Sequence, residues 1–230
     1  MKEEIETLYH YPRVLILDTD ITPRSVMQQD SINQFIQGTS RILVSTQAIL
    51  HKNNIPPVDV VGIISLDTML YAPTYAASEQ VYHLIDGLLS YCKPRGGCLL
   101  QTHTPDYAPL RMIAAQQYLT FINQEREIRK QLHYPPFSHA VKLIFSDLSA
   151  SKAKEKAQKI KHYCISELEK RDKDSECIGP FAGYIPKVKN RYIYALLLKI
   201  KNISLEQRNS ILRALSARVD SIDVDPESVL

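Results

Sequence analysis

The sequence predicts an α/β protein in two parts: an amino-terminal unit built on a mostly parallel sheet, then a ferredoxin-like α+β domain of β-α-β-β-α-β order. Two observations predict this. Up to about residue 133, short apolar runs alternate with helical patterns, and beyond it the elements follow the split order. Between them, "YPPF" (134–137) ends a helix, because neither proline can continue one. We therefore expect domains at 1–133 and 134–230.

The amino-terminal part alternates buried strands with helices, which favours a parallel sheet covered on both faces. One helix is expected from about Ser25 to Gln37, with Thr22-Pro23 as its start signal and Gly38 as its end. A second contains Ala76, Ala77 and Leu88, and a third is expected over 107–133. The expected strands are 14–18, 41–45, 59–65 and 98–102.

The carboxy-terminal part has its own order of elements. A strand with one wet face is followed by a lysine-rich amphipathic helix and a short strand. A long aromatic and aliphatic strand, a helix and a closing strand come next. The clearest of these segments are 140–146, 149–170, 191–200, 205–217 and 219–226.

Composition limits the class of protein. The chain has 230 residues, of which 44% are hydrophobic and 23% charged, enough for a sizeable core. No run of about 18 apolar residues predicts a membrane span, and the acidic start lacks an apolar signal region. Four cysteines are too few for a disulfide framework. We expect a cytoplasmic protein that does not bind membranes.

Charge is divided unevenly along the chain. Residues 1–138 contain 11 Lys and Arg against 13 Asp and Glu, whereas residues 139–230 contain 17 against 12. The carboxy-terminal part is therefore the better candidate for contact with a polyanion such as nucleic acid. The alternative is an ordinary solvated lysine surface.

The stretch "CKPRGGCLLQTH" (92–103) combines glycines, basic residues and cysteines. It does not match a phosphate-binding loop, which needs G-x-x-x-x-G-K-[ST] between a strand and a helix. Cys92 and Cys98 lack zinc-ligand spacing, and no second pair follows. We expect Gly96-Gly97 to form a helix-to-strand turn in which at least one glycine has a positive φ. No metal site and no catalytic residue is predicted in this chain.

Asp67 differs from the other carboxylates by its place. It follows an apolar strand at the carboxyl end, where ligands bind in open α/β sheets. The alternative is that Asp67 only caps the turn after the strand. The seven histidines are scattered and form no H-E-x-x-H pattern.

Several motifs in order then resemble one family. "RILVSTQAIL" (41–50) and "VDVVGIISLDTMLYAPTYAASE" (58–79) resemble the second motor lobe of superfamily 2 helicases, specifically the PriA-type replication-restart helicases (primosomal protein N′). "IGPFAGYIPKVKNRYIYALLLK" (178–199) and "IDVDP" (222–226) resemble the end of the same family. The positions that correspond to its helicase motifs are Thr46, Gln47, Asp67, Tyr71, Glu79 and 100–103.

The resemblance implies a partial RecA-like lobe followed by the family's carboxy-terminal domain. The full-length family is an ATP-dependent DNA helicase that uses ATP, Mg and Zn. It binds branched or single-stranded DNA and meets primosome and single-strand-binding proteins. The resemblance begins inside the second lobe, so we expect either a piece of a longer protein or a natural fragment.

Departures from the family pattern argue against a working motor. The two finger arginines are replaced by Leu88 and Tyr91, or by Tyr91 and Pro94, and Arg95 is the only arginine nearby. Such arginines stabilise charge on the transferred phosphoryl group. The chain alone is therefore expected to need no cofactor and to be no ATPase. The alternatives are a fragment of an active ATP-dependent 3′–5′ DNA helicase that uses Arg95, and an unrelated metabolic α/β enzyme.

Candidate DNA-binding residues lie near the end of the resemblance. Lys187, Lys189 and Arg191 precede an aromatic strand with Tyr192 and Tyr194. Basic side chains suit phosphate contact, and tyrosine rings suit base stacking. The alternative is that the tyrosines belong to the core and the basic residues are only solvated.

Overall fold

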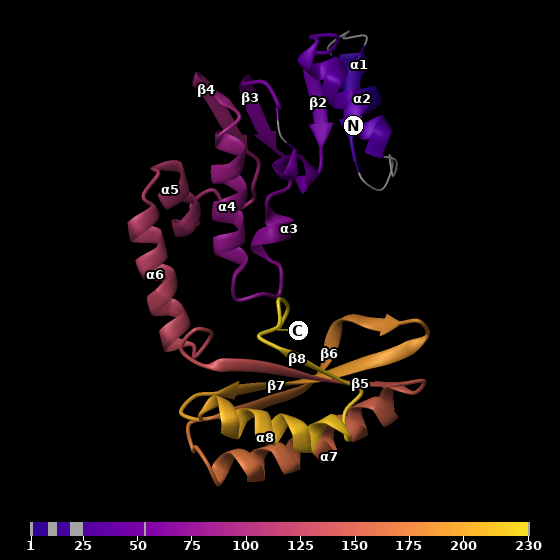
Figure 1. The fold of residues 1–230 in the computed structure, drawn as a ribbon, viewed down its shortest axis with the longest axis vertical. Coiled ribbons are helices and arrows are strands. Elements are labelled where there is room, and N and C mark those ends of the chain that lie inside the picture. Colours follow the sequence, from indigo (N-terminus) through magenta and orange to yellow (C-terminus); the bar gives the residue numbers. More distant parts are fainter. Residues whose placement is uncertain (1, 9–12, 19–24, 53, 230) are drawn as a thin grey trace. The chain divides into compact units, whose positions relative to one another are not determined.

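The computed structural model describes residues 2–8, 13–18, 25–52 and 54–229 (Figure 1). It is a mixed α/β structure with parallel and antiparallel sheets. The chain forms two compact units, one of residues 1–67 with 81–105 and one of residues 68–80 with 106–230. None of the described helices is long and apolar enough to cross a membrane.

The first unit contains two parallel strand pairs, β1 with β2 and β3 with β4. The sequence predicts one parallel sheet covered on both faces. In the described residues the pairs are instead two separate two-stranded sheets. Gly38 ends α2 with φ 71°, as predicted, whereas the start signal Thr22-Pro23 lies outside the described residues. The elements up to residue 105, of which the segment 68–80 belongs to the second unit, are α1 (Lys2–Leu8), β1 (Val14–Leu17), α2 (Ser25–Ile36), β2 (Ile42–Ser45), the 3₁₀ helix η1 (Gln47–His51), β3 (Val58–Ile63), α3 (Asp67–Leu70), α4 (Ala77–Leu89) and β4 (Cys92–Leu100).

The Gly96-Gly97 prediction was wrong in its geometry. Both glycines lie inside β4, and neither has a positive φ. Pairing jumps from Val58–Cys92 to Val60–Gly97, so β4 advances five residues while β3 advances two, and the excess forms a bulge. A Cβ on Gly96 would lie 2.9 Å from the backbone oxygen of Asp59. The glycine is therefore needed for close approach of two backbones.

After residue 105 the second unit continues with two helices where the sequence predicts one over 107–133. The break is at Gln116, which has φ 55° and cannot continue a helix. Arg129 and Lys130 lie in the last turn of the second helix, a position that suits the partial negative charge at a helix end. The two helices are α5 (Ala108–Ala114) and α6 (Tyr118–Gln131).

The rest of the second unit is a four-stranded antiparallel sheet with two helices. The element order is β-α-β-β-α-β, as predicted, and the strand order is β6-β7-β5-β8. Both helices lie on one face of the sheet (Figure 1). The capping box of Ser204 and Gln207 fixes the start of α8. The elements are β5 (His139–Asp147), α7 (Ala150–Glu169), β6 (Glu176–Val188), β7 (Arg191–Ile200), α8 (Leu205–Ser216) and β8 (Ser221–Val224).

A continuous core fills the space between this sheet and its helices. Alternate residues of β5 and β7 point into it because strand side chains alternate between faces. Each large apolar side chain that is fully buried contributes about 1.5–3 kcal/mol. The core includes Leu143, Phe145, Cys164, Leu168, Leu196, Leu198, Ile200, Ile211 and Leu215.

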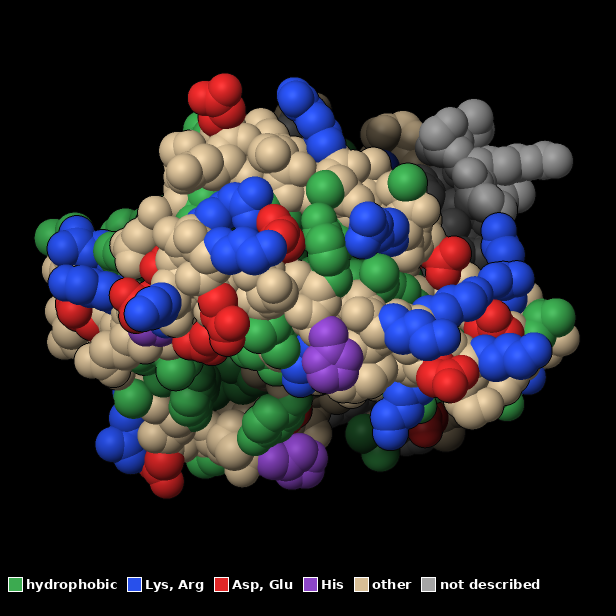
Figure 2. Space-filling view, turned by 90° about the horizontal axis from the view of Figure 1, so that it is seen from below, with side chains coloured by type: hydrophobic (Ala, Val, Ile, Leu, Met, Phe, Trp, Pro, Cys, Tyr) green, Lys and Arg blue, Asp and Glu red, His purple; other side chains and the backbone are tan. Residues whose placement is uncertain are grey.

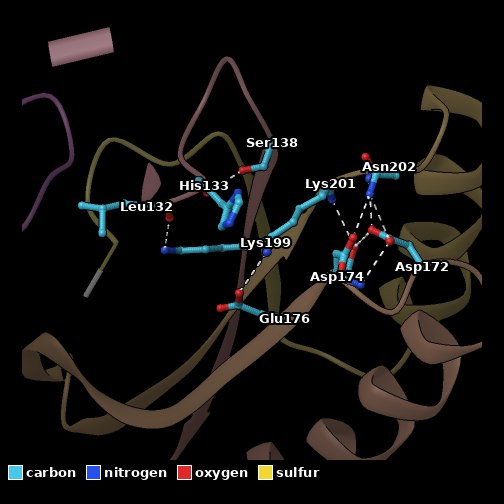
Figure 3. A network of polar contacts seen from close by, with 10 residues as sticks. Leu132, His133, Ser138, Asp172, Asp174, Glu176, Lys199, Lys201 and Asn202 are labelled. Atoms are coloured by element: carbon cyan, nitrogen blue, oxygen red, sulfur yellow. Dashed lines mark hydrogen bonds and ion pairs between the residues drawn. The ribbon is translucent and has the colours of Figure 1, made fainter. Parts of the chain in front are cut away.

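Polar contacts fix the loops at one end of the sheet (Figure 3). Asp172, in the loop after α7, accepts hydrogen bonds from the Asn202 backbone N–H (3.0 Å) and from Ser175 Oγ (2.6 Å). Burial disfavours the charge of Asp172, but these hydrogen bonds outweigh it and lower its pKa to about 2. Lys199 Nζ donates to the Leu132 backbone oxygen at 2.9 Å. These bonds join β7 to segments distant in sequence.

Candidate nucleic-acid interface

Asp67, one of the motif residues, links the segments that follow β3 and β4. Its carboxylate accepts hydrogen bonds from Thr102 Oγ1 (2.8 Å) and from the His103 backbone N–H (3.1 Å). Partial burial works against the charge, but these hydrogen bonds outweigh it and lower the pKa of Asp67. Asp67 begins α3, and the hydrogen bonds of its carboxylate therefore connect the start of this helix to the segment that follows β4.

Glu79 is also engaged within its own unit. It forms an ion pair with Arg129 of α6, which binds Glu125 at 3.0 Å and lies 5.2 Å from the ring centroid of Tyr75. The Tyr75 ring stacks on that of Tyr134, with centroids 5.2 Å apart. Glu79 therefore anchors the segment 68–80 to the helix α6.

Of the other motif positions, Tyr71 is exposed in the segment 68–80 of the second unit, and the rest lie in the first unit. Thr46 precedes η1 and Gln47 begins it, while Arg95 is exposed in the β4 bulge. Tyr91, at a finger position, donates its hydroxyl hydrogen bond to the backbone oxygen of Ile49 at 3.1 Å. This hydrogen bond connects the turn after α4 to η1.

The predicted DNA-binding residues gather at the β6–β7 hairpin. Its two turn residues, Lys189 and Asn190, have φ of 45° and 64°, which suits the tight turns that join twisted antiparallel strands. Lys187 pairs directly with Tyr192, and Lys187 Nζ lies 5.0 Å from the ring centroid. The stacked ammonium and the exposed Lys189 put positive charge at the tip of the hairpin.

Arg191 and Lys156 of α7 bind the same backbone carbonyl oxygen, so positive charge continues from the hairpin to α7. The Ser146 oxygen accepts hydrogen bonds from Arg191 Nη2 at 3.1 Å and from Lys156 Nζ at 3.3 Å. Lys156 also pairs with Asp147 at 2.8 Å. Two cations from distant segments therefore meet at the end of β5.

The neighbouring lysines lower the pKa of the Asp147 carboxylate. Hydrogen bonding from Lys156 is the largest cause that lowers the pKa of Asp147, and Lys152 adds to it. Asp220 is also near, since it accepts a hydrogen bond from the Ser146 backbone N–H at 2.6 Å. We define the hairpin-end cluster as five basic residues: Lys156 and Arg191, which bind the Ser146 oxygen, Lys152, which acts on Asp147, and Lys187 and Lys189 of the hairpin.

Tyr194 differs from the other four predicted residues. It packs against the buried core between the sheet and its helices. It also pairs with the core residue Phe145 on the neighbouring strand. The core alternative therefore describes Tyr194, whereas Tyr192 is only half-buried and contacts Lys187.

Lys152 and Lys156 were missed as site residues, although the lysine-rich helix was visible in the sequence. Their relation to the hairpin depends on the pairing of β5 with β7, which periodicity does not reveal. Figure 2 looks onto the side of the second unit where α7 and α8 lie, and acidic side chains are interspersed there among basic ones. Helix α7 contains five lysines (152, 154, 156, 159, 161) and three glutamates (155, 167, 169).

Among the described residues, no group of three or more His, Cys, Asp or Glu side chains could hold a metal ion. Cys92 and Cys98 are free thiols, and burial is the main cause that raises the pKa of Cys98. No phosphate-binding loop occurs in the sequence.

Comparison with known proteins identifies the class of the carboxy-terminal domain. Residues 130–227 match the family model of the primosomal protein N C-terminal domain, a range that includes the whole antiparallel sheet and its helices. The matches to whole proteins also include most of the residues before this domain. Residues 130–227 therefore belong to this domain family, and the chain as a whole is similar to the C-terminal portion of PriA-type replication restart proteins.

Three relatives describe the extent of this similarity. The replication restart protein PriA of Bacillus subtilis is 28% identical over 87% of the chain, and that of Chlamydia muridarum is 32% identical over 97%. The PriA of Borreliella burgdorferi is 26% identical over 90%. The chain spans 25%, 31% and 31% of the lengths of these relatives.

Proposed function

We propose that the chain binds branched or single-stranded DNA through the hairpin-end cluster of its carboxy-terminal domain. The observation that carries the proposal is the meeting of Arg191 and Lys156 at the Ser146 carbonyl, inside the segment that matches the domain family. Cations spaced along such an edge suit a phosphate backbone, and the Tyr192 ring beside Lys187 suits a stacked base.

The proposal includes the finer fold. The order β6-β7-β5-β8 with both helices on one face supports a ferredoxin-like domain. The parallel pairs β1–β2 and β3–β4 support a partial RecA-like lobe. The proposed partners are DNA, primosome proteins and single-strand-binding protein, and the proposed compartment is the cytoplasm.

The chain alone is proposed to be a binding and docking module without ATPase activity. Neither Leu88 nor Tyr91 can supply the positive charge of a finger arginine. The purified chain should release no phosphate above background with or without DNA. DNA-stimulated phosphate release that is lost in Arg95→Ala would favour the alternative of an active helicase fragment.

DNA affinity measured across a salt series tests the binding proposal. Fluorescence anisotropy with labelled forked and single-stranded DNA gives log affinity against log salt, whose slope reports the phosphates neutralised, about −0.7 to −0.9 each. The double variant Lys187→Ala with Lys189→Ala should weaken binding to all sequences alike and flatten the slope by roughly one to two units.

A matched control removes the same charge elsewhere. Lys170 and Lys173 are exposed near the carboxyl end of α7, outside the cluster. Replacing both with alanine should leave the slope almost unchanged. Equal effects of the two double variants would assign binding to net charge alone, and affinity that does not depend on salt would contradict the proposal.

A further inference from the structure

One face of the β3–β4 sheet is apolar and uncovered. Parallel pairing sets Val60 opposite Gly97 and Gly62 opposite Leu99, so these four residues share a face. The exposed fractions of Val60, Ile64 and Leu99 are 58%, 57% and 68%. We call these three residues with Gly62 and Gly97 the open β3–β4 face.

The opposite face of the same two strands is packed. Ile63 is buried, and Val61 and Leu100 are half-buried. Strands of parallel sheets are apolar on both sides because helices cover both faces. The open β3–β4 face therefore has the composition of a buried surface without the cover.

The shape of the open face suits a helix. Gly62 and Gly97 have no atom within 4 Å of where a Cβ would stand, so the surface is flat between the three apolar side chains. Such a flat strip lets another backbone approach closely. The face has no charged residue among its five members, which argues against a phosphate ligand and for an apolar one.

The lengths of the relatives indicate which segment could supply a helix that covers this face. The chain spans only about a quarter to a third of each relative named above. A two-stranded sheet is marginal by itself and needs packing against further elements. We propose that the open β3–β4 face binds an amphipathic helix from the amino-terminal remainder of a PriA-type polypeptide, whether this remainder is joined to the chain or supplied separately. The inference rests on the family match and not on DNA binding.

Binding in trans tests the proposal. The probes are the parts of the Bacillus subtilis and Chlamydia muridarum PriA proteins that precede the matched region, each purified as a separate chain. Sedimentation velocity should show a complex of this chain with at least one probe. Leu99→Lys should weaken the complex at least about tenfold, because it places a charge in an apolar interface.

The control variant is Leu148→Lys in the second unit, where the leucine is 68% exposed, as Leu99 is. It should leave the complex intact. Val60→Lys repeats the test if Leu99→Lys fails to fold by circular dichroism. Absence of a complex with both probes, or equal losses from the Leu99 and Leu148 variants, overturns the proposal. A dimer of this chain alone that Leu99→Lys dissociates overturns it in favour of self-association.

Discussion

The two kinds of sheet in this molecule differ in how completely they are covered. The antiparallel sheet of the second unit buries Leu196 and Leu198 fully against its helices, and both residues belong to one continuous core. The parallel pair β3–β4 leaves Leu99 on a face without cover. Both sheets contain similar apolar residues, so composition alone does not show whether a sheet face is covered by helices.

The two units also differ in how their sheets are packed. A core that is closed on one side by α7 and α8 gives the antiparallel domain its own stability, and the family match covers the same residues. The first unit has two small sheets instead of one. The molecule thus joins a sheet that has a buried core on one face to a unit with an exposed apolar sheet face.

Truncating a buried leucine and an exposed leucine should have very different effects on stability. Leu198→Ala should cost about 2–5 kcal/mol of unfolding free energy, because it leaves a cavity in the core of the antiparallel sheet. Leu99→Ala should change stability by no more than about 0.5 kcal/mol, because the side chain is exposed. Urea unfolding followed by circular dichroism gives both values. A cost for Leu99→Ala as large as that for Leu198→Ala would mean that the β3–β4 face is already covered.

The order of elements in the antiparallel domain was predictable because each element has a local signal. The lysine-rich segment has no proline or glycine and forms α7, and the aromatic run forms β7. The β4 bulge was not predictable, because it depends on the approach of the Gly96 backbone to Asp59 from another strand.

The candidate site was predictable in part for the same reason. Lys187, Lys189 and Arg191 are close in sequence, so their gathering at one hairpin follows from the chain itself. The contribution of Lys156 depends on the Ser146 carbonyl, which lies in a different strand from Arg191. Contacts between segments distant in sequence leave no periodic pattern to read.

The two neighbouring glycines of β4 should respond differently to substitution. Gly96→Ala should destabilise the first unit by about 1–3 kcal/mol, because the new Cβ would press on the Asp59 oxygen. Gly97→Ala has open space and should be nearly neutral or stabilise by up to about 1 kcal/mol. Denaturant midpoints of the two variants decide this. Equal destabilisation by both would show that the bulge does not distinguish the two glycines.

A smaller change in stability is expected from Asp172, in the loop after α7. Asp172→Asn should cost about 1–2 kcal/mol at pH 7, because the charged acceptor of several hydrogen bonds is lost. The folded pKa of Asp172 is lowered to about 2, so its contribution is fully present above the unfolded pKa of about 4 and disappears as pH falls through 4 toward 2. The stability gap between the wild type and the variant should therefore be constant from pH 7 to about 5 and narrow below pH 4. Urea unfolding at half-unit pH steps measures this gap, and Asp174→Asn is a suitable control because Asp174 is more exposed. A gap that stays constant down to pH 3 would mean that the hydrogen bonds at Asp172 do not depend on its charge.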